Sequence, residues 1–200
     1  NAEVLEIGTG AGTLTNIIAN NVKRVCTYEI DPNLREYLTD KFASIDNVEL
    51  NFQDIMNVPT TDIDDKFPNG YHIVANLPYY ITTPIIMKLV EDDINVDKIV
   101  VMVQKEVGNS FKAEPGTKDY SSLSIFLKDY FQVSKLLDVS KNVFIPKPNV
   151  DSIVVEFSKK ENSYEVKDKK KFFKLVKDSF TQKRKTLRNN LKGYDLDKIE

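Results

Sequence analysis

The sequence predicts an α/β fold with a doubly wound, parallel sheet, followed by the start of a small helical domain. Three observations lead to this prediction. Short apolar runs of strand length recur between residues 1 and 103, segments with helical spacing of apolar residues lie between them, and a lysine-rich helical segment follows residue 158. Alternating strands and helices of this length favour parallel strands joined by helical crossovers.

The predicted elements follow one another in a regular order. The first strand ends at a glycine cluster, and Asp31 caps a helix that opens with Pro32, which suits a first helical turn. The predicted strands lie at residues 4–7, 24–28, 48–52, 72–75, 98–103, 131–139 and 150–157. The predicted helices lie at residues 14–22 and 31–42, from about residue 83 onward, and around residues 123–126 and 172–180.

Charge divides the chain into two unequal parts. Residues 1–158 hold 14 Lys and Arg against 23 Asp and Glu, a net charge of −9, whereas residues 159–192 hold 13 against 4, a net charge of +9. A concentrated cationic block favours a nucleic-acid partner. We therefore predict one domain over residues 1–158 and the beginning of a basic, helical domain over residues 159–200. The chain enters a strand within two residues of its start, so we expect it to begin inside a domain.

Composition argues against several classes of protein. Cys26 is the single cysteine and cannot form an intramolecular disulfide, and no apolar run is long enough to span a bilayer. We therefore expect a cytoplasmic protein with no membrane segment. No metal site is predicted, and Cys26 and the single histidine, His72, are assigned structural roles.

A glycine-rich turn after the first strand is the first candidate binding site. Glu6 precedes it, and Gly8, Gly10 and Gly12 let the backbone turn sharply and approach a ligand closely. Thr13 is expected to cap the next helix, whose N-terminal N–H groups favour an anion such as a carboxylate. The G-x-G-x-G spacing differs from the G-x-G-x-x-G of dinucleotide-binding proteins, which makes an NAD enzyme the weaker hypothesis. A purely structural turn is the other alternative.

Carboxylates follow the second and third predicted strands. Glu29, next to Ile30, ends the second strand, and Asp54, next to Ile55, follows the third. Ligands of open α/β sheets lie at the carboxyl ends of strands. Glu29 is therefore placed to accept both hydroxyls of a ribose, and Asp54 to accept a hydrogen bond from an adenine amine whose ring meets the next backbone N–H. Surface acids without a role are the alternative for each residue singly.

The string Asn76-Leu77-Pro78-Tyr79 ends the fourth predicted strand and resembles the motif of enzymes that methylate amino groups. An adenine amine is a poor nucleophile because its lone pair is delocalised into the ring. The Asn76 side-chain oxygen and the Leu77 carbonyl would accept its two N–H groups and favour a tetrahedral nitrogen. Pro78 has no N–H to compete, and Tyr79 offers a face for an unstacked base, a contact worth about 1 to 3 kcal/mol. A proline loop with a core tyrosine is the alternative.

Longer strings carry a resemblance to a known family. They are NLPYYITTPII at 76–86, MVQKE at 102–106, PGTKDY at 115–120, FIPKPNVDS at 144–152 and FTQKRKTLRNNL at 180–191. Together with the glycine-rich turn, they resemble the KsgA family of ribosomal RNA small subunit methyltransferase A, which are adenine dimethyltransferases. The resemblance covers essentially the whole chain. It implies the fold of class I S-adenosylmethionine-dependent methyltransferases, with S-adenosylmethionine as the cofactor and S-adenosylhomocysteine as its product.

The same resemblance implies a substrate and its contacts. The enzyme would transfer four methyl groups to two adjacent adenosines in the 3′-terminal hairpin loop of small-subunit ribosomal RNA, as a monomer acting on a pre-ribosomal subunit. Phe144 would stack on the target base opposite Tyr79, with a core phenylalanine as the alternative. The predicted phosphate contacts are Lys183, Arg184, Lys185 and Arg188, for which a solvated helix face is the alternative. Relatives carry a further segment before the first strand, which is expected to be missing here.

Three other functions remain open at this stage. The sister family of large-subunit adenine methyltransferases, which confer macrolide resistance, shares the glycine-rich turn and the Asn76 motif. A ribosome-assembly factor that binds RNA without catalysis is a second alternative, and a DNA adenine methyltransferase is a third. The context of Tyr80 and Thr83-Pro84 and the FIPKP run at 144–148 favour the small-subunit family.

Overall fold

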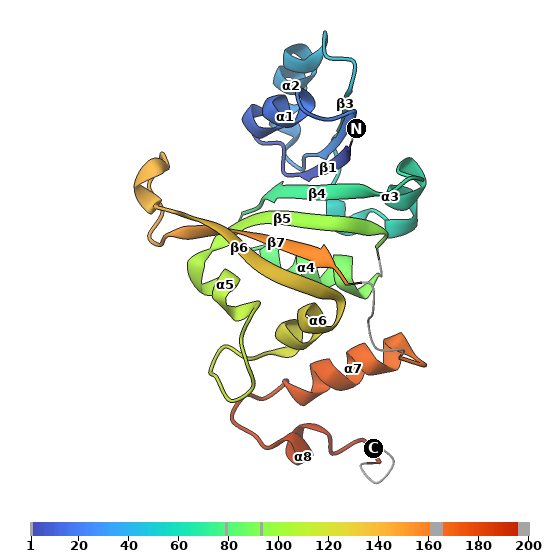
Figure 1. The fold of residues 1–200 in the computed structure, drawn as a ribbon, viewed down its shortest axis with the longest axis vertical. Helices are drawn as coiled ribbons and strands as arrows, with labels where there is room; N and C mark the ends of the chain where they lie inside the picture. Colours follow the sequence, from blue (N-terminus) through green and yellow to red (C-terminus); the bar gives the residue numbers. More distant parts are fainter. Residues whose placement is uncertain (1, 79, 93, 161–165, 196–200) are drawn as a thin grey trace.

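A computed structural model describes residues 2–78, 80–92, 94–160 and 166–195, and these residues build one seven-stranded sheet flanked by helices (Figure 1). The strand order is β3-β2-β1-β4-β5-β7-β6. The strands are β1 (Glu3–Ile7), β2 (Arg24–Tyr28), β3 (Val48–Asn51), β4 (Tyr71–Asn76), β5 (Val96–Gln104), β6 (Phe131–Val139) and β7 (Ser152–Lys159). All seven lie where the sequence predicts strands, because their buried β-branched and aromatic residues suit a covered sheet.

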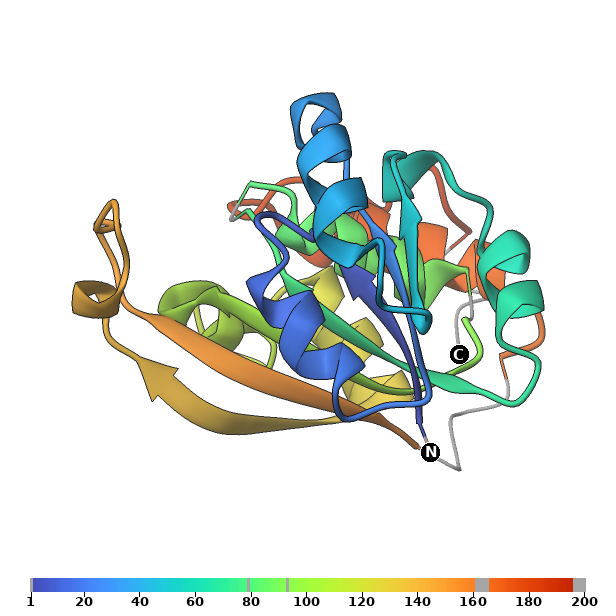
Figure 2. The ribbon, with the colours of Figure 1, turned by 90° about the horizontal axis from the view of Figure 1, so that it is seen from above.

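The sheet is parallel over the five strands that alternate with helices, as predicted, and the prediction needs correction at β7 alone, since β6 runs in the same direction as β5. Strands β1 to β5 are parallel, but β7 is antiparallel to β5 and to β6. No helical crossover joins β6 to β7, and only a crossover could have kept them parallel. The connecting residues 140–151, which we call the β6–β7 arm, project beyond the body of the sheet (Figure 2).

The helices include two that the sequence did not predict. The helices are α1 (Thr13–Ala19), α2 (Arg35–Phe42), α3 (Thr60–Lys66), α4 (Thr82–Glu91), α5 (Lys105–Ser110), α6 (Ser122–Tyr130), α7 (Lys169–Ser179) and α8 (Leu187–Asn190), with short 3₁₀ turns at Pro32–Leu34, Ile55–Asn57 and Lys141–Val143. Helices α3 and α5 were not expected. Asp31 caps its turn as predicted, whereas Thr13 does not cap α1, because the N-cap is Gly12.

The C-terminal segment packs on the sheet domain through aromatic side chains. The ring centroids of Phe126 on α6 and Phe173 on α7 are 4.3 Å apart, and Phe173 and Val176 are buried with the sheet's core residues. Figure 1 shows α7 and α8 beyond α6, at the far end of the molecule from α1 and α2. The division at residue 158 stays a prediction. Within the described residues, no helix has the length and apolar character needed to cross a bilayer.

Candidate active site

The glycine-rich turn between β1 and α1 is held by hydrogen bonds to its own backbone and to β2. Gly8 N donates to the Tyr28 carbonyl over 2.9 Å, and Gly12 N donates to the Thr9 carbonyl over 2.9 Å. Gly8, Gly10 and Gly12 have φ values of 84°, 53° and 71°, in the left-handed region that favours glycine. The protein's own contacts therefore set the shape of the turn.

At two of these glycines, the lack of a side chain lets the turn pack closely against other parts of the protein. A Cβ atom at Gly12 would lie 2.7 Å from Phe42 Cε2 and 3.2 Å from Leu38 Cδ2, because the turn packs directly on α2. A Cβ atom at Gly8 would lie 3.4 Å from the Asn76 carbonyl oxygen. The predicted cofactor turn thus passes directly over the end of β4, where the predicted target motif begins.

Glu29 ties the end of β2 to this turn. Its side chain is 8% exposed, Oε2 accepts a hydrogen bond from Gly10 N over 2.8 Å, and Oε1 accepts one from Asp31 N over 2.8 Å. Each carboxylate oxygen has two lone pairs. Glu29 can therefore support the turn and still accept hydroxyl groups of a ligand.

Glu6 lies beneath the turn. Its side chain is fully buried, Oε2 accepts the Thr15 hydroxyl hydrogen bond over 2.6 Å, and Oε1 has no hydrogen-bond partner among the described residues. Burial raises the pKa of Glu6 to about 7, and the nearby Glu29 carboxylate adds to this effect. Glu6 borders neither of the cavities described next, and its part in cofactor binding stays a prediction.

A cavity of about 350 Å³ opens at the carboxyl ends of the parallel strands. It lies where β1 has β2 on one side and β4 on the other, a switch point at which open α/β sheets bind ligands. The predicted site residues that border it are Gly8, Gly10, Glu29, Ile30, Asp54, Ile55, Asn76, Leu77 and Pro78. Gly12 is absent from this set because it faces α2. Two carboxylates with apolar walls between them suit an adenosine, which has hydroxyl and amine donors and a flat ring.

A second cavity, of about 590 Å³, adjoins the first. Gly8, Gly10 and Asn76 border both cavities. Its floor is a face of the sheet formed by Val74, Val100, Met102 and Val154. The two cavities therefore meet at the point where the glycine-rich turn crosses the end of β4.

The backbone of the target motif is fixed by the burial of Leu77 and by a hydrogen bond to Pro78. Asn76 is exposed at the end of β4, Leu77 is buried at 4% exposure, and the Pro78 carbonyl accepts a hydrogen bond from the Thr82 hydroxyl over 3.2 Å. This places the Asn76 side chain on fixed backbone at the junction of the two cavities. Tyr79, the predicted stacking residue, lies outside the described residues.

Phe144 lies in the β6–β7 arm and borders neither of these two cavities. The arm enters β7 at Ser152, which pairs with Gln104 at the carboxyl end of β5. Asn76 ends the neighbouring parallel strand β4, so the arm leaves the sheet at the same end as Asn76. The stacking role of Phe144 stays a prediction.

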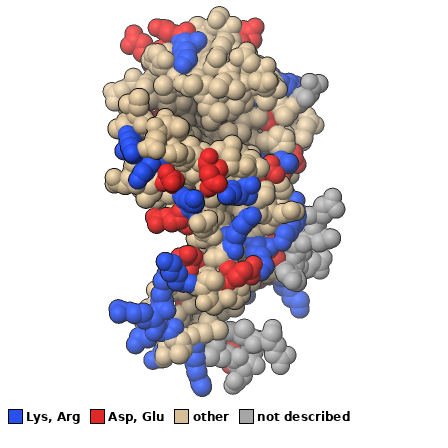
Figure 3. All heavy atoms as spheres, turned by 60° about the vertical axis from the view of Figure 1, so that its left-hand side comes forward, with Lys and Arg blue, Asp and Glu red and all other residues tan. Residues whose placement is uncertain are grey.

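The basic C-terminal segment contains two kinds of cation. Three lysines of α7 form ion pairs, which are Lys171 with Asp168, Lys174 with Asp178 and Lys177 with Glu91. The predicted phosphate contacts Lys183, Arg184, Lys185 and Arg188 are exposed, and their side chains make no hydrogen bond or ion pair with any residue that the structure describes. Figure 3 shows cationic side chains gathered at the lower end of the molecule. The unpaired cations are free to meet phosphates.

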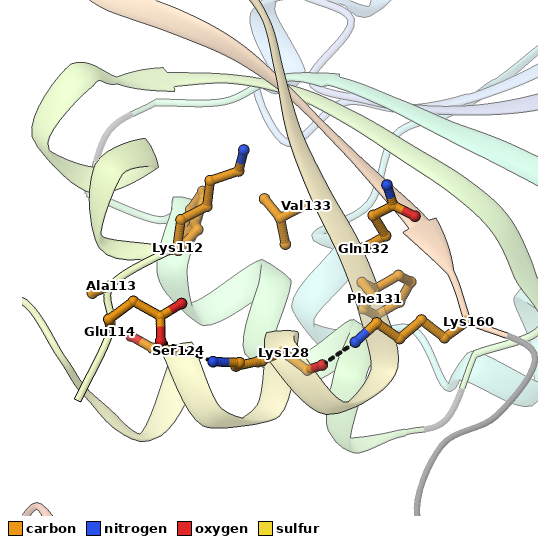
Figure 4. A pocket seen from close by; sticks show the side chains of 10 residues that line it. Lys112, Ala113, Glu114, Ser124, Lys128, Phe131, Gln132, Val133 and Lys160 are labelled. Carbon is orange, nitrogen blue, oxygen red and sulfur yellow. Dashed lines mark hydrogen bonds and ion pairs between the residues drawn. The ribbon is translucent and has the colours of Figure 1, made fainter.

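A third cavity, of about 390 Å³, lies between α6 and β6 and contains none of the predicted site residues (Figure 4). Its Lys128 forms an ion pair with Glu114 over 2.9 Å, and Lys160 Nζ donates a hydrogen bond to the Lys128 carbonyl. These cations connect α6 to the segments on either side of it. We therefore assign this cavity a structural role.

A family model described as "Ribosomal RNA adenine dimethylase" matches residues 1–197. The chain belongs to the ribosomal RNA adenine dimethylase family. Among members of this kind, it is similar to ribosomal RNA small subunit methyltransferase A of Staphylococcus epidermidis, with 45% identity over 195 residues, 96% of this chain and 66% of the relative. The protein of the same name from Bacillus cytotoxicus is 45% identical over 191 residues, 94% of this chain and 65% of the relative. The chain thus spans about two thirds of the length of these relatives.

Solved structures confirm the methyltransferase fold of this dimethylase-family chain. A dimethyladenosine transferase from Plasmodium falciparum matches with a TM-score of 0.79 and 31% identity, over 96% of this chain and 68% of that one. The 23S rRNA methyltransferase ErmE matches with a TM-score of 0.72 and 24% identity, over 100% of this chain and 79% of that one. The second likeness concerns the fold alone.

Three residues outside the predicted set of site residues also shape the site of this dimethylase-family chain. Thr15 holds Glu6, Phe42 packs against the glycine-rich turn, and Tyr80, 82% exposed, borders the first cavity. Phe42 lay on the predicted apolar face of its helix, which gave no sign of its partner. Thr15 gave no signal, because periodicity does not reveal buried polar contacts. Tyr80 directly follows the motif, and its position was the available clue.

Proposed function

We propose that this protein transfers methyl groups from S-adenosylmethionine to the N6 amines of adenosines in small-subunit ribosomal RNA. One observation carries the proposal: the glycine-rich turn and the Asn76 motif border the same two cavities, with a Gly8 Cβ position only 3.4 Å from the Asn76 carbonyl oxygen. Membership of the dimethylase family and the 45% identity to small-subunit enzymes support the choice of substrate.

The residues around the first cavity fit S-adenosylmethionine. Glu29 would accept the ribose hydroxyls, Asp54 would accept the adenine amine, and Ile30 and Ile55 would cover the ring. The second cavity offers room for the methionyl part beside Gly8. When bound, this cofactor supplies an electrophilic methyl group on a sulfonium.

The Asn76 motif makes the amine of the target adenosine nucleophilic. The Asn76 side-chain oxygen and the Leu77 carbonyl accept its two N–H groups, which draws the nitrogen lone pair out of conjugation with the ring. The nitrogen loses a proton to solvent after each methyl transfer, and no strong base is required. Stacking on Tyr79 and Phe144 would hold the base outside its own stack.

The substrate contacts follow from the free cations. Lys183, Arg184, Lys185 and Arg188 would meet phosphates of the RNA, and such contacts position a nucleic acid without reading its sequence. The proposed target is a pair of adjacent adenosines in the 3′-terminal hairpin loop, which receive four methyl groups in a pre-ribosomal subunit, with the protein acting as a monomer.

Methyl transfer to separated ribosomal subunits tests this function. Tritium from labelled S-adenosylmethionine should enter adenosines of under-methylated small subunits, and Asn76→Ala should lower the rate by about 100-fold, as for loss of one critical hydrogen-bonding group in an active site. Asn16→Ala, an exposed position on α1 outside both cavities, is the matched control.

Each alternative function predicts a different pattern in the same assay. Label in large subunits instead would assign the protein to the macrolide-resistance type. RNA binding without label in either subunit would indicate a non-catalytic assembly factor. The bordering positions of Glu29, Asp54 and Asn76 argue for catalysis.

A further inference from the structure

We propose that the tip of the β6–β7 arm is an apolar wedge that enters the ribosomal RNA loop and separates the bases beside the target adenosine. The wedge consists of Val143 and Ile145, on either side of Phe144. This proposal rests on the proposed function, because a base must leave its stack before its amine can reach Asn76.

The wedge residues are the most exposed aliphatic side chains at this end of the molecule. Ile145 is 101% exposed and Val143 is 69% exposed, and Val150 on the returning side of the arm is 36% exposed. Isolated exposed aliphatic residues are ordinary, but here three lie on one arm, and all three are exposed. Figure 2 shows that this arm projects from the sheet.

Hydrogen bonds hold the backbone of the arm that carries these side chains. Lys141 N donates to Asp151 Oδ1 over 2.9 Å, and Lys141 Nζ donates to the Asn149 carbonyl over 3.1 Å, which ties the two sides of the arm together. Lys105 N donates to the Asp151 carbonyl over 3.0 Å, which ties the arm to α5. A preformed tip suits a wedge, because little ordering is left to be done on binding.

The charge of the arm and its location favour RNA as the partner that contacts the tip. Lys141 and Lys147 flank the tip, and neither forms an ion pair within the described part of the chain. The single carboxylate of the arm, Asp151, is occupied by Lys141 N. The tip therefore offers aliphatic groups beside two lysines that no described carboxylate neutralises, although Lys141 Nζ donates to the Asn149 carbonyl. The arm leaves the sheet at the end where Asn76 lies. Apolar side chains between base steps, with cations on the adjacent phosphates, are a known way to unstack a nucleic acid.

Fluorescence of 2-aminopurine tests the wedge directly. The probe replaces the base next to the target in an RNA hairpin of the small-subunit loop, where unstacking raises its emission. The protein should raise emission, and the double variant Val143→Ser/Ile145→Ser should reduce that rise and weaken hairpin binding by roughly tenfold, the scale of lost base contacts. Leu137→Ser, at a 50% exposed position on β6, is the matched control and should behave as wild type.

A rescue experiment separates wedging from general binding. An abasic site in place of the probe removes the need for unstacking, so the double variant should then bind within about twofold of wild type. Binding of labelled S-adenosylmethionine should be unchanged in every variant. A double variant that matches Leu137→Ser, wild-type binding with no rise in emission, or a defect that the abasic site does not rescue would each overturn the wedge.

Methyl transfer to small subunits keeps this proposal distinct from the proposed function. If wild type does not methylate small subunits, the proposed function fails. If wild type methylates them and the double variant does so at the same rate, the wedge alone fails. A double variant that is defective on assembled subunits but binds the naked hairpin normally would indicate a ribosomal protein as the contact, which also contradicts the wedge.

Discussion

The proposed cofactor side and the proposed RNA side of the site differ in how far the protein satisfies its own polar groups. On the cofactor side, Glu29 accepts two backbone N–H groups and Glu6 is buried against Thr15. On the RNA side, the side chains of Arg184 and its neighbours have no partner among the described residues, and Ile145 is fully exposed. The first region is part of the folded core, and the second is exposed surface.

This difference predicts that substitutions in the two regions will have different effects on stability. Substitutions on the cofactor side should change the free energy of unfolding as well as cofactor binding, because the same groups serve both. Substitutions on the RNA side should leave folding nearly unchanged, since exposed positions usually contribute less than about 0.5 kcal/mol to stability. The comparison fails if both regions respond alike.

The largest effect is expected at Gly12. Gly12→Val places a branched side chain at φ 71°, with its Cβ 2.7 Å from Phe42 Cε2, and should lower the free energy of unfolding by roughly 3 to 5 kcal/mol in urea titrations. Gly116→Val is the control, because Gly116 has φ 86° but nothing within 4 Å of its Cβ position. Equal losses at the two positions would remove the packing explanation.

A smaller, pH-dependent effect is expected at Glu6. Its pKa in the folded protein is raised from 4.5 to about 7, so the folded state holds the proton more tightly than the unfolded chain. Stability should therefore fall as pH rises from about 4.5 to about 7 and then level off. Glu6→Gln should flatten this profile and, at pH 8, raise the free energy of unfolding by up to about 3 kcal/mol.

Urea titrations at pH 5, 6, 7 and 8 measure this profile. Glu36→Gln, at an exposed position on α2, is the matched control and should keep the wild-type slope. A wild-type profile that rises between pH 5 and 7, with no change in Glu6→Gln, would mean that the buried carboxyl does not govern it.

The smallest effects are expected from the cations. Removing Arg184 should lower the slope of log binding constant against log salt concentration by about 0.7 to 0.9 for small-subunit RNA, because one phosphate contact is lost. Lys171→Ala removes a cation that is paired with Asp168 and should change the slope less. Filter binding between 50 and 200 mM salt measures both slopes. Similar slopes for the two variants would mean that pairing does not distinguish these cations.

Sequence patterns predicted the strands and the proposed cofactor side well, but they did not predict contacts between residues far apart in the chain. The seven strands and the capping role of Asp31 followed from local signals, since apolar runs and turn residues act over a few positions. The antiparallel direction of β7 did not, because it depends on how distant strands pair. Helix α3 was missed because Ile63 is its one buried residue, which is too few for a helical pattern.

The site itself was predictable where its residues follow strand ends. Gly8, Glu29, Asp54 and Asn76 meet at one cavity as the order of the parallel strands requires. The position of Glu6 beneath the turn could not be predicted, because a strand residue next to a glycine cluster can face either way. The exposure of Ile145 also needed the structure, because an aliphatic residue in a proline-containing segment can be either buried or exposed.

Cofactor binding and methyl transfer, measured in one dialysis chamber, test the division of the site most directly. Wild type, Glu29→Ala and Asn76→Ala are first equilibrated with labelled S-adenosylmethionine and then mixed with under-methylated small subunits. Our account predicts that Glu29→Ala loses most cofactor binding, whereas Asn76→Ala keeps it within about tenfold but transfers label to adenosine about 100-fold more slowly. Equal loss of binding and transfer in both variants, or normal transfer by Asn76→Ala, would contradict it.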